Sequence, residues 1–203
     1  MSWYLRLADR TLTPQLKALL PHISNPGNLT DAELEAAGVV RAVVEQPTVK
    51  WWQRRGERVD DIDQRPAHVT WQVDELDLEE ARAVAWERVK AERETRQIGP
   101  MPYVYPSGQT HHNTMTERVV RDLTASTTTA VALHAAGGAE PVMAWTVDEN
   151  VTHMLTPAEM IAFGLTATQW HSAIHLQSQT LRAAIYAAET VEAVVSAAQW
   201  SDG

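Results

Sequence analysis

The chain has 203 residues, and its 17 Lys and Arg against 26 Asp and Glu give a formal net charge of −9. A nucleic-acid partner would need a basic stripe, and none is visible, so we expect no nucleic-acid binding. The absence of cysteine excludes disulfides, thiolate catalysis and cysteine-based zinc sites. No stretch approaches the ~20 apolar residues that span a bilayer, and no signal peptide is apparent, so we expect a soluble protein made in the cytoplasm with no membrane partner.

Residues 1–76 predict a small α+β module. Thr13-Pro14 and the capping-box pattern Thr30-Asp31-Ala32-Glu33 each begin a short helix. Strands are predicted over residues 39–44, 49–53 and 68–73, with a hairpin turn at Arg55-Gly56. The expected result is a small antiparallel sheet with short helices.

The tryptophans predict contacts with other chains. The sequence has eight Trp and one Phe, and Trp suits half-wet interfaces because it combines a large apolar area with an N–H donor. In an alternating strand, Trp51 would point inward and Trp52 outward to form an interface. A carbohydrate platform formed by both rings is the alternative.

Residues 77–98 predict one helix that connects the N-terminal module to the rest. Asp77 to Glu80 form a capping-box pattern, and Gly99-Pro100 ends the helix. Its apolar stripe consists of Ala81, Ala85, Trp86 and Val89.

Residues 99–203 predict a mainly α-helical domain with one β-hairpin over residues 142–155. A loop or short hairpin precedes a helix that starts near Thr116. A long alanine-rich helix starts at Thr156-Pro157-Ala158-Glu159, where Pro stands at the first helical position and Glu completes a capping box. We expect Gly164 to break this helix, and the restarted helix to continue without interruption toward Gly203. The fold class predicted for the whole chain is therefore α+β.

A heptad pattern runs along the long helix and predicts a partner helix. One series of positions is Ile174, Leu181, Ala188 and Val195, and its companion is Trp170, Gln177, Ala184, Val191 and Ala198. The partner could be the Thr116–Ala136 helix of the same chain or a second copy in a homo-oligomer, and the pattern leaves both open. The residues predicted to form interfaces are Trp52, Trp170, Ile174, Gln177, Leu181, Val191 and Val195.

His171 and His175 are the strongest chemical candidates, because residues four apart on a helix share a face and could bind one metal ion. A third ligand would have to come from His111, His112 or His153. No acidic residue separates the pair, as a His-Glu-x-x-His protease would require. We therefore favour a structural role for both side chains, and predict no metal, no cofactor and no catalytic residues.

The segment Trp145 to Met160, with its Trp-containing hairpin and its Leu-Thr-x-x-Glu helix start, resembles a domain of unknown function that recurs in phage tail-fibre-like and prophage tail proteins. Trp170-His171, Ala183 to Ala188 and the helix from Glu117 to Ala125 extend the resemblance over roughly residues 100–198. The hairpin turn Asp148-Glu149-Asn150 and the histidines 111 and 112 depart from the pattern. The resemblance implies no catalytic residues.

This resemblance implies a non-catalytic structural subunit of a phage tail, located in the virion and made in the host cytoplasm. Its expected partners are other phage tail proteins and further copies of itself. An assembly chaperone that is absent from the finished virion is one alternative. A metal-binding protein or enzyme that uses His171 and His175 is another.

Overall fold

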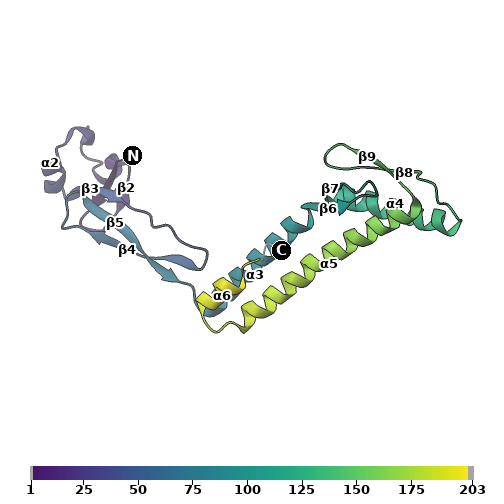
Figure 1. The fold of residues 1–203 in the computed structure, drawn as a ribbon. Helices are drawn as coiled ribbons and strands as arrows, with labels where there is room; N and C mark the ends of the chain where they lie inside the picture. The colour runs from purple at the N-terminus through teal and green to yellow at the C-terminus, as the bar shows by residue number, and fades with distance from the viewer. Residues whose placement is uncertain (1, 201–203) are drawn as a thin grey trace. The chain divides into compact units, whose positions relative to one another are not determined.

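The structure is a computed structural model that describes residues 2–200. The chain forms two compact units, Met1–Asp77 and Leu78–Gly203. The described residues form a mixed α/β fold with six α-helices, one five-stranded sheet and two two-stranded sheets (Figure 1).

The N-terminal unit is built on the five-stranded sheet, whose order is β2-β1-β3-β5-β4. Its strands are β1 (Trp3–Arg6), β2 (Leu12–Thr13), β3 (Val39–Val44), β4 (Gln53–Asp61) and β5 (Ala67–Glu75). The helices that accompany them are α1 (Leu16–Leu19), the 3-10 helix η1 (Pro26–Asn28) and α2 (Asp31–Ala36). Because β3 pairs in parallel with β5, the sheet is mixed, and the predicted antiparallel sheet is wrong.

Two buried clusters stabilise this unit. Alternate residues of β3 point to opposite faces of the sheet, which places Val39 and Val40 in different clusters. Val39 packs with Leu34 of α2 and with the leucines of α1, whereas Val40 packs with Leu5 of β1. The predicted capping box of α2 is confirmed: Thr30 Oγ1 accepts from the backbone N–H of Glu33, and the Glu33 carboxylate accepts from Thr30 N at 2.8 Å.

The strand boundaries of the N-terminal unit differ from the prediction in two places. Strand β4 begins at Gln53, so Trp51 and Trp52 lie in the turn before it. Arg55 and Gly56 lie inside β4, where the pairing with β5 shifts register, and they do not form a hairpin turn.

The C-terminal unit joins four helices to two β-hairpins. The helices are α3 (Leu78–Gln97), α4 (Glu117–Ala135), α5 (Pro157–Ala187) and α6 (Val191–Ala197). The hairpins are β6 (Pro100–Val104) with β7 (Thr110–Thr114), and β8 (Met143–Thr146) with β9 (Thr152–Leu155). In Figure 1, α4 runs beside the first half of α5 and α3 runs beside its second half.

The predicted architecture of the C-terminal part is wrong in two respects. Two hairpins are present where one was expected, because residues 100–114 form a paired β6–β7 hairpin. The predicted connector helix, α3, packs against α5 and α6 as an integral part of this unit. Its buried residues Ala81, Ala85 and Val89 recur every four positions, so they form one stripe along the helix.

Helix α5 also differs from its predicted outline. It runs unbroken through Gly164 and ends at Ala187, where Gly and Pro are both absent. At Gly164 an added Cβ would lie 2.4 Å from Thr127 Oγ1 of α4, so glycine permits the close approach of α4 and α5. Thr190 starts α6 separately, because its side chain accepts from the backbone N–H of Ala193.

Candidate functional site

The inner face of α5 is covered by helices of the same chain. Its buried and half-buried residues follow the alternating steps of four and three that define a heptad seam. We call these positions the inner seam: Met160, Gly164, Ala167, His171, Ile174, Ser178, Leu181, Ile185 and Ala188. Helix α4 covers its first half and α3 its second half, both antiparallel to α5. The chain therefore supplies the partner helices of the inner seam itself.

The predicted heptad series are placed differently by the structure. Ile174 and Leu181 lie in the inner seam as expected, half-buried. The companion positions of the seam are His171, Ser178 and Ile185, one residue later than predicted, and the predicted Ala184 is exposed. Val191 and Val195 are half-buried on the separate helix α6.

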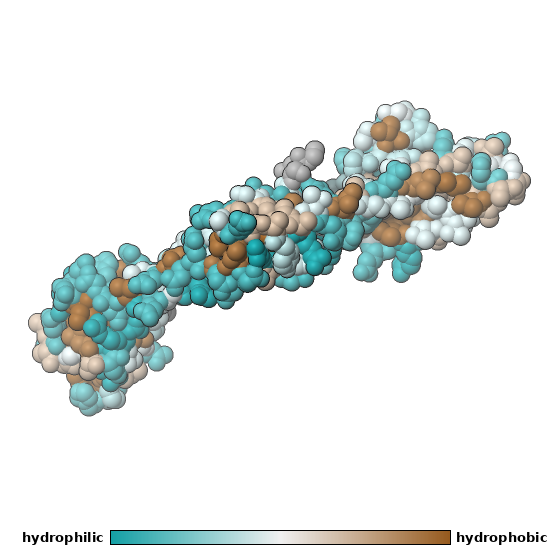
Figure 2. Space-filling model, turned by 90° about the horizontal axis from the view of Figure 1, so that it is seen from below, coloured by the Kyte–Doolittle hydropathy of each residue, from teal (hydrophilic) through white to brown (hydrophobic). Residues whose placement is uncertain are grey.

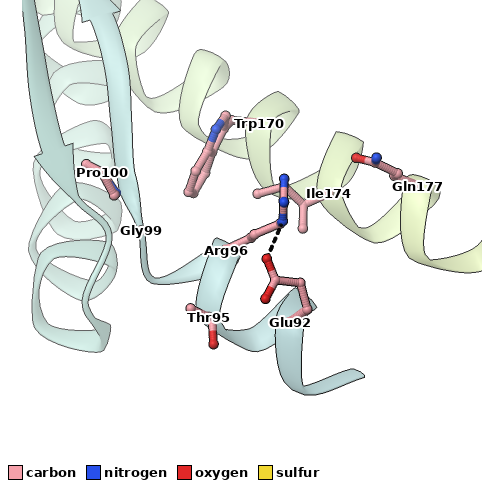
Figure 3. Close-up of a pocket in the computed structure, with 8 residues that line it drawn as sticks. All are labelled: Glu92, Thr95, Arg96, Gly99, Pro100, Trp170, Ile174 and Gln177. Carbon is pink, nitrogen blue, oxygen red and sulfur yellow. Dashed lines mark hydrogen bonds and ion pairs between the residues drawn. The ribbon is translucent and has the colours of Figure 1, made fainter. Parts of the chain in front are cut away.

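Trp170, Ile174 and Gln177 line a pocket of about 430 Å³ between α3 and α5 (Figure 3). Glu92, Thr95 and Arg96 of α3 line the opposite wall, together with Gly99 and Pro100. Arg96 Nε donates to Glu92 Oε1 at 2.7 Å, and its guanidinium carbon lies 5.0 Å from the Trp200 ring centroid. The charged groups of the pocket thus neutralise each other, which leaves the apolar surface of Trp170 and Ile174 as its main binding feature.

The structure does not bring the predicted histidine pair into a metal site. His171 lies in the inner seam with its ring edge-on to Trp170, at a centroid distance of 5.1 Å, whereas His175 is exposed. Burial lowers the pKa of His171, and its Nε2 has no hydrogen-bond partner within residues 2–200. Among those residues, no group of three or more His, Cys, Asp or Glu side chains is placed to hold a metal ion.

The two hairpins meet around a buried asparagine that the sequence did not single out. Asn113 Oδ1 accepts from the Tyr105 hydroxyl and from Trp145 Nε1, both at 3.0 Å. His153 stacks on Tyr105 with the ring centroids 3.9 Å apart. Burial raises the pKa of Tyr105 and lowers the pKa of His153, so both are held in their neutral forms. The hydrogen bonds of Asn113 Oδ1 link the two hairpins, whereas Asn113 Nδ2 and His153 Nε2 are buried without a hydrogen-bond partner within residues 2–200.

The turn of the second hairpin accepts hydrogen bonds from strand β7 through Asp148 and Glu149. Thr114 donates to Asp148 Oδ2 from its backbone N–H and its hydroxyl, both at 2.8 Å. His112 Nδ1 lies 3.0 Å from Glu149 Oε1, and the His112 backbone N–H donates to the same oxygen at 3.1 Å. These contacts with His112 lower the pKa of Glu149. His111 and His112 are therefore part of a paired strand, which is the short hairpin that the sequence left open beside a loop.

Trp52 lies outside the C-terminal unit and forms a small aromatic group with its neighbours. The Trp51 and Trp52 rings meet edge to face, with centroids 5.3 Å apart, and Lys50 Nζ lies 4.9 Å from the Trp52 ring centroid. Both rings are half-buried, so the expected division into one buried and one exposed Trp is wrong. Edge-to-face rings do not form a flat carbohydrate platform.

The C-terminal unit exposes several large apolar side chains that the heptad prediction overlooked. Figure 2 shows brown and pale surface extending over this unit toward the end that carries the hairpins. The exposed residues are Val84, Ile98, Val104, Val131, Leu133, Val142, Val151, Met154, Leu165, Leu176 and Tyr186. A signal in the sequence could have found part of this surface, because the 31 residues of α5 include only two that are Asp, Glu, Lys or Arg, namely Glu159 and Arg182.

The fold and these sites define a two-unit chain whose second unit combines four helices with two β-hairpins. Residues 80–199 match the family described as Domain of unknown function (DUF4376), and the chain belongs to this family. The match spans nearly all of the C-terminal unit, from α3 through α6. No curated protein and no solved structure matches the chain. No helix in residues 2–200 is long and apolar enough to cross a membrane.

Proposed function

We propose that this chain is a non-catalytic structural subunit of a phage tail that acts by docking to other tail proteins and to copies of itself. The tail context is supported by the resemblance of residues 145–160 and their flanking helices to a domain of phage tail-fibre-like proteins. Membership of an uncharacterised family agrees with this proposal without naming an activity.

The exposed apolar surface of the C-terminal unit is the observation that carries the docking role. Leu165 and Leu176 are 58% and 68% exposed on α5, and Val104 and Val142 are each 61% exposed. Contiguous exposed apolar side chains mark protein–protein contacts, and Leu165 and Leu176 lie on the same face of α5, about three helical turns apart. Four such residues within one family-matched unit favour an assembly component.

The chemistry of the hairpins supports a structural role in a second way. Tyr105, Asn113 and Trp145 direct their polar atoms toward one another in the interior. His112 Nδ1 lies 3.0 Å from Glu149 Oε1, which adds a contact between the two hairpins. Such an arrangement holds a surface in place for a partner.

Quantitative mass spectrometry of purified phage particles tests the proposal. A virion subunit is expected in a fixed ratio to known tail proteins, both in the infected-cell lysate and in the purified particles. A chain that is abundant in the lysate and lost from the particles would contradict the proposal. That outcome would favour an assembly chaperone.

A further inference from the structure

The outer face of α5 carries a second heptad series, opposite the inner seam. Starting at residue 158, steps of four and three residues visit eight positions that we call the outer seam: Ala158, Ala162, Leu165, Gln169, Ser172, Leu176, Gln179 and Ala183. All are exposed except Gln179, which is half-buried. The series spans about 38 Å of helix at 1.5 Å per residue. Within residues 2–200, no other helix or strand buries these positions.

The composition of the outer seam suits close contact with another helix. Its two leucines are the large apolar residues, and alanines at both ends allow two helices to approach closely. Gln169 and Ser172 at the centre bring polar groups that can bond across an interface. None of the eight residues is Asp, Glu, Lys or Arg.

We propose that the outer seam pairs with the outer seam of a second copy, in antiparallel orientation, to form a symmetric dimer. This proposal rests on the proposed function, since it names the surface and the geometry of the self-association. When two copies align antiparallel about a point between residues 170 and 171, Leu165 of one copy faces Leu176 of the other. The remaining pairs are Ala158 with Ala183, Ala162 with Gln179, and Gln169 with Ser172.

Three of the four pairs are chemically matched, and the fourth places Ala162 beside Gln179. Each leucine meets a leucine, the outermost alanines meet alanines, and the central glutamine meets a serine that can bond with it. A two-fold symmetric interface must be self-complementary in this way, because each surface patch contacts its own copy. The parallel alignment would instead stack Gln169 on Gln169 and Gln179 on Gln179.

Charge selects a second copy over a charged partner. The chain has a net charge of −9, so two copies repel each other wherever acidic faces meet. Helix α3 carries five Glu and five Lys or Arg, so a contact with its exposed face would have to bury charged side chains. The outer seam has no charge of either sign, so two copies can meet there without repulsion and an oppositely charged protein gains nothing.

Light scattering of the full chain after size exclusion tests the interface. We expect twice the chain mass of 22.6 kDa for the wild type and for a Thr180→Glu/Ala184→Glu control, which adds the same two negative charges on the exposed flank of α5. The double variant Leu165→Glu/Leu176→Glu is expected to be monomeric, with its helical circular dichroism retained. A monomeric wild type, or a double variant that stays dimeric, overturns the proposal.

Single cysteines test the orientation, because the natural chain has none. A mixture of Leu165→Cys and Leu176→Cys chains is expected to form a disulfide between the two variants on oxidation. Each variant alone is expected to stay uncrosslinked, since identical positions would lie about 16 Å apart along the helix axis, beyond the reach of a disulfide. Efficient crosslinking of Leu165→Cys to itself would overturn the antiparallel arrangement.

This test is separate from that of the proposed function. A monomeric chain found at fixed ratio in phage particles would overturn the dimer alone, and would assign the outer seam to another tail protein. A dimer that is absent from the particles would overturn the proposed tail role and leave the dimer standing.

Discussion

The two faces of α5 follow the same heptad spacing and differ in what covers them. The inner seam meets α3 and α4 of its own chain, and Ile185 and Met160 are fully buried there. The outer seam has a similar stride, yet Leu165 and Leu176 are mostly exposed. A heptad pattern therefore predicts that a partner helix exists, and only the fold of the rest of the chain shows which face still needs one.

The polar residues of the two faces reinforce this difference. On the inner seam, the buried Ser178 hydroxyl donates to the His175 carbonyl of its own helix at 2.7 Å, so it needs no partner. On the outer seam, Gln169 and Ser172 face solvent and keep their side chains free for a contact across an interface. The inner face packs against helices of its own chain, and the outer face is exposed.

The largest effect is expected from Phe163→Ala on the buried side of α5. Phe163 is fully buried, with its ring 4.7 Å from Tyr103 and 5.3 Å from Trp145, centroid to centroid. Truncation should lower the free energy of unfolding by about 3–5 kcal/mol, through lost burial and a cavity. Urea unfolding followed by far-ultraviolet circular dichroism measures it. The control Leu165→Ala, measured at a dilution where the chain is monomeric, should change stability by less than about 0.5 kcal/mol, and equal costs at the two positions would refute the comparison.

A smaller effect is expected at the point where α4 and α5 touch. In Gly164→Ala, the new Cβ would lie 2.4 Å from Thr127 Oγ1, so the helices must separate, at a cost of about 1–3 kcal/mol. Alanine is a better helix former than glycine by about 1 kcal/mol, so the sign depends on this contact. A double-mutant cycle with Thr127→Ala measures the coupling. Most of the penalty should disappear in the Thr127→Ala background, and a Gly164→Ala variant that is stabilised in the natural background would contradict the contact.

The sequence predicts a structural feature correctly where that feature depends only on residues close together in the chain. The capping boxes at Thr30 and Thr156 are both confirmed, because each needs only a Thr and a Glu three residues apart. The parallel pairing of β3 with β5 could not be predicted in the same way. It joins Ala42 to Ala67 across an intervening strand, and no local pattern encodes that choice.

The errors along α5 have identifiable physical causes. Gly164 is a common helix breaker, yet here the close approach of α4 favours a residue without a Cβ. The break before α6 carries no Gly or Pro, and its only local signal is the capping threonine Thr190. The predicted companion series was Trp170, Gln177 and Ala184, and the observed one is His171, Ser178 and Ile185. Each series mixes polar and apolar residues, so the sequence does not separate them. The outer seam contains no charged residue, and the sequence alone shows this. The predicted heptad series did not take this signal into account.

A pH effect is expected from the inner seam. Burial lowers the pKa of His171 below its ordinary value of 6.5, so the unfolded chain binds a proton that the folded chain excludes. Stability should therefore be fully present above pH 6.5 and fall as the pH drops below it, by at most about 1.4 kcal/mol per pH unit for each such histidine. His153 acts in the same direction, because burial and His111 lower its pKa.

His171→Gln separates this contribution from the rest. Unfolding should be measured between pH 7.5 and pH 5.5, about one unit on either side of the ordinary histidine pKa. The free energy of unfolding should depend less steeply on pH in the variant than in the wild type. Glu149 has a pKa below its ordinary value of 4.5, so its contribution is lost only at more acidic pH and does not interfere. An unchanged slope would show that His171 is protonated freely in the folded chain.

The smallest effect is expected on the outer seam, and its concentration dependence makes it informative. Leu176 is 68% exposed, so Leu176→Ala should change the stability of a dilute monomeric chain by less than about 0.5 kcal/mol. If the outer seam pairs two copies, association stabilises the folded chain by mass action, and the wild-type melting temperature should rise with protein concentration. Leu176→Ala should weaken that rise, whereas Phe163→Ala should lower the melting temperature at every concentration and keep the rise. A melting temperature independent of concentration in the wild type would place the outer seam among ordinary solvent-facing surfaces, and the two faces of α5 would then differ only in burial.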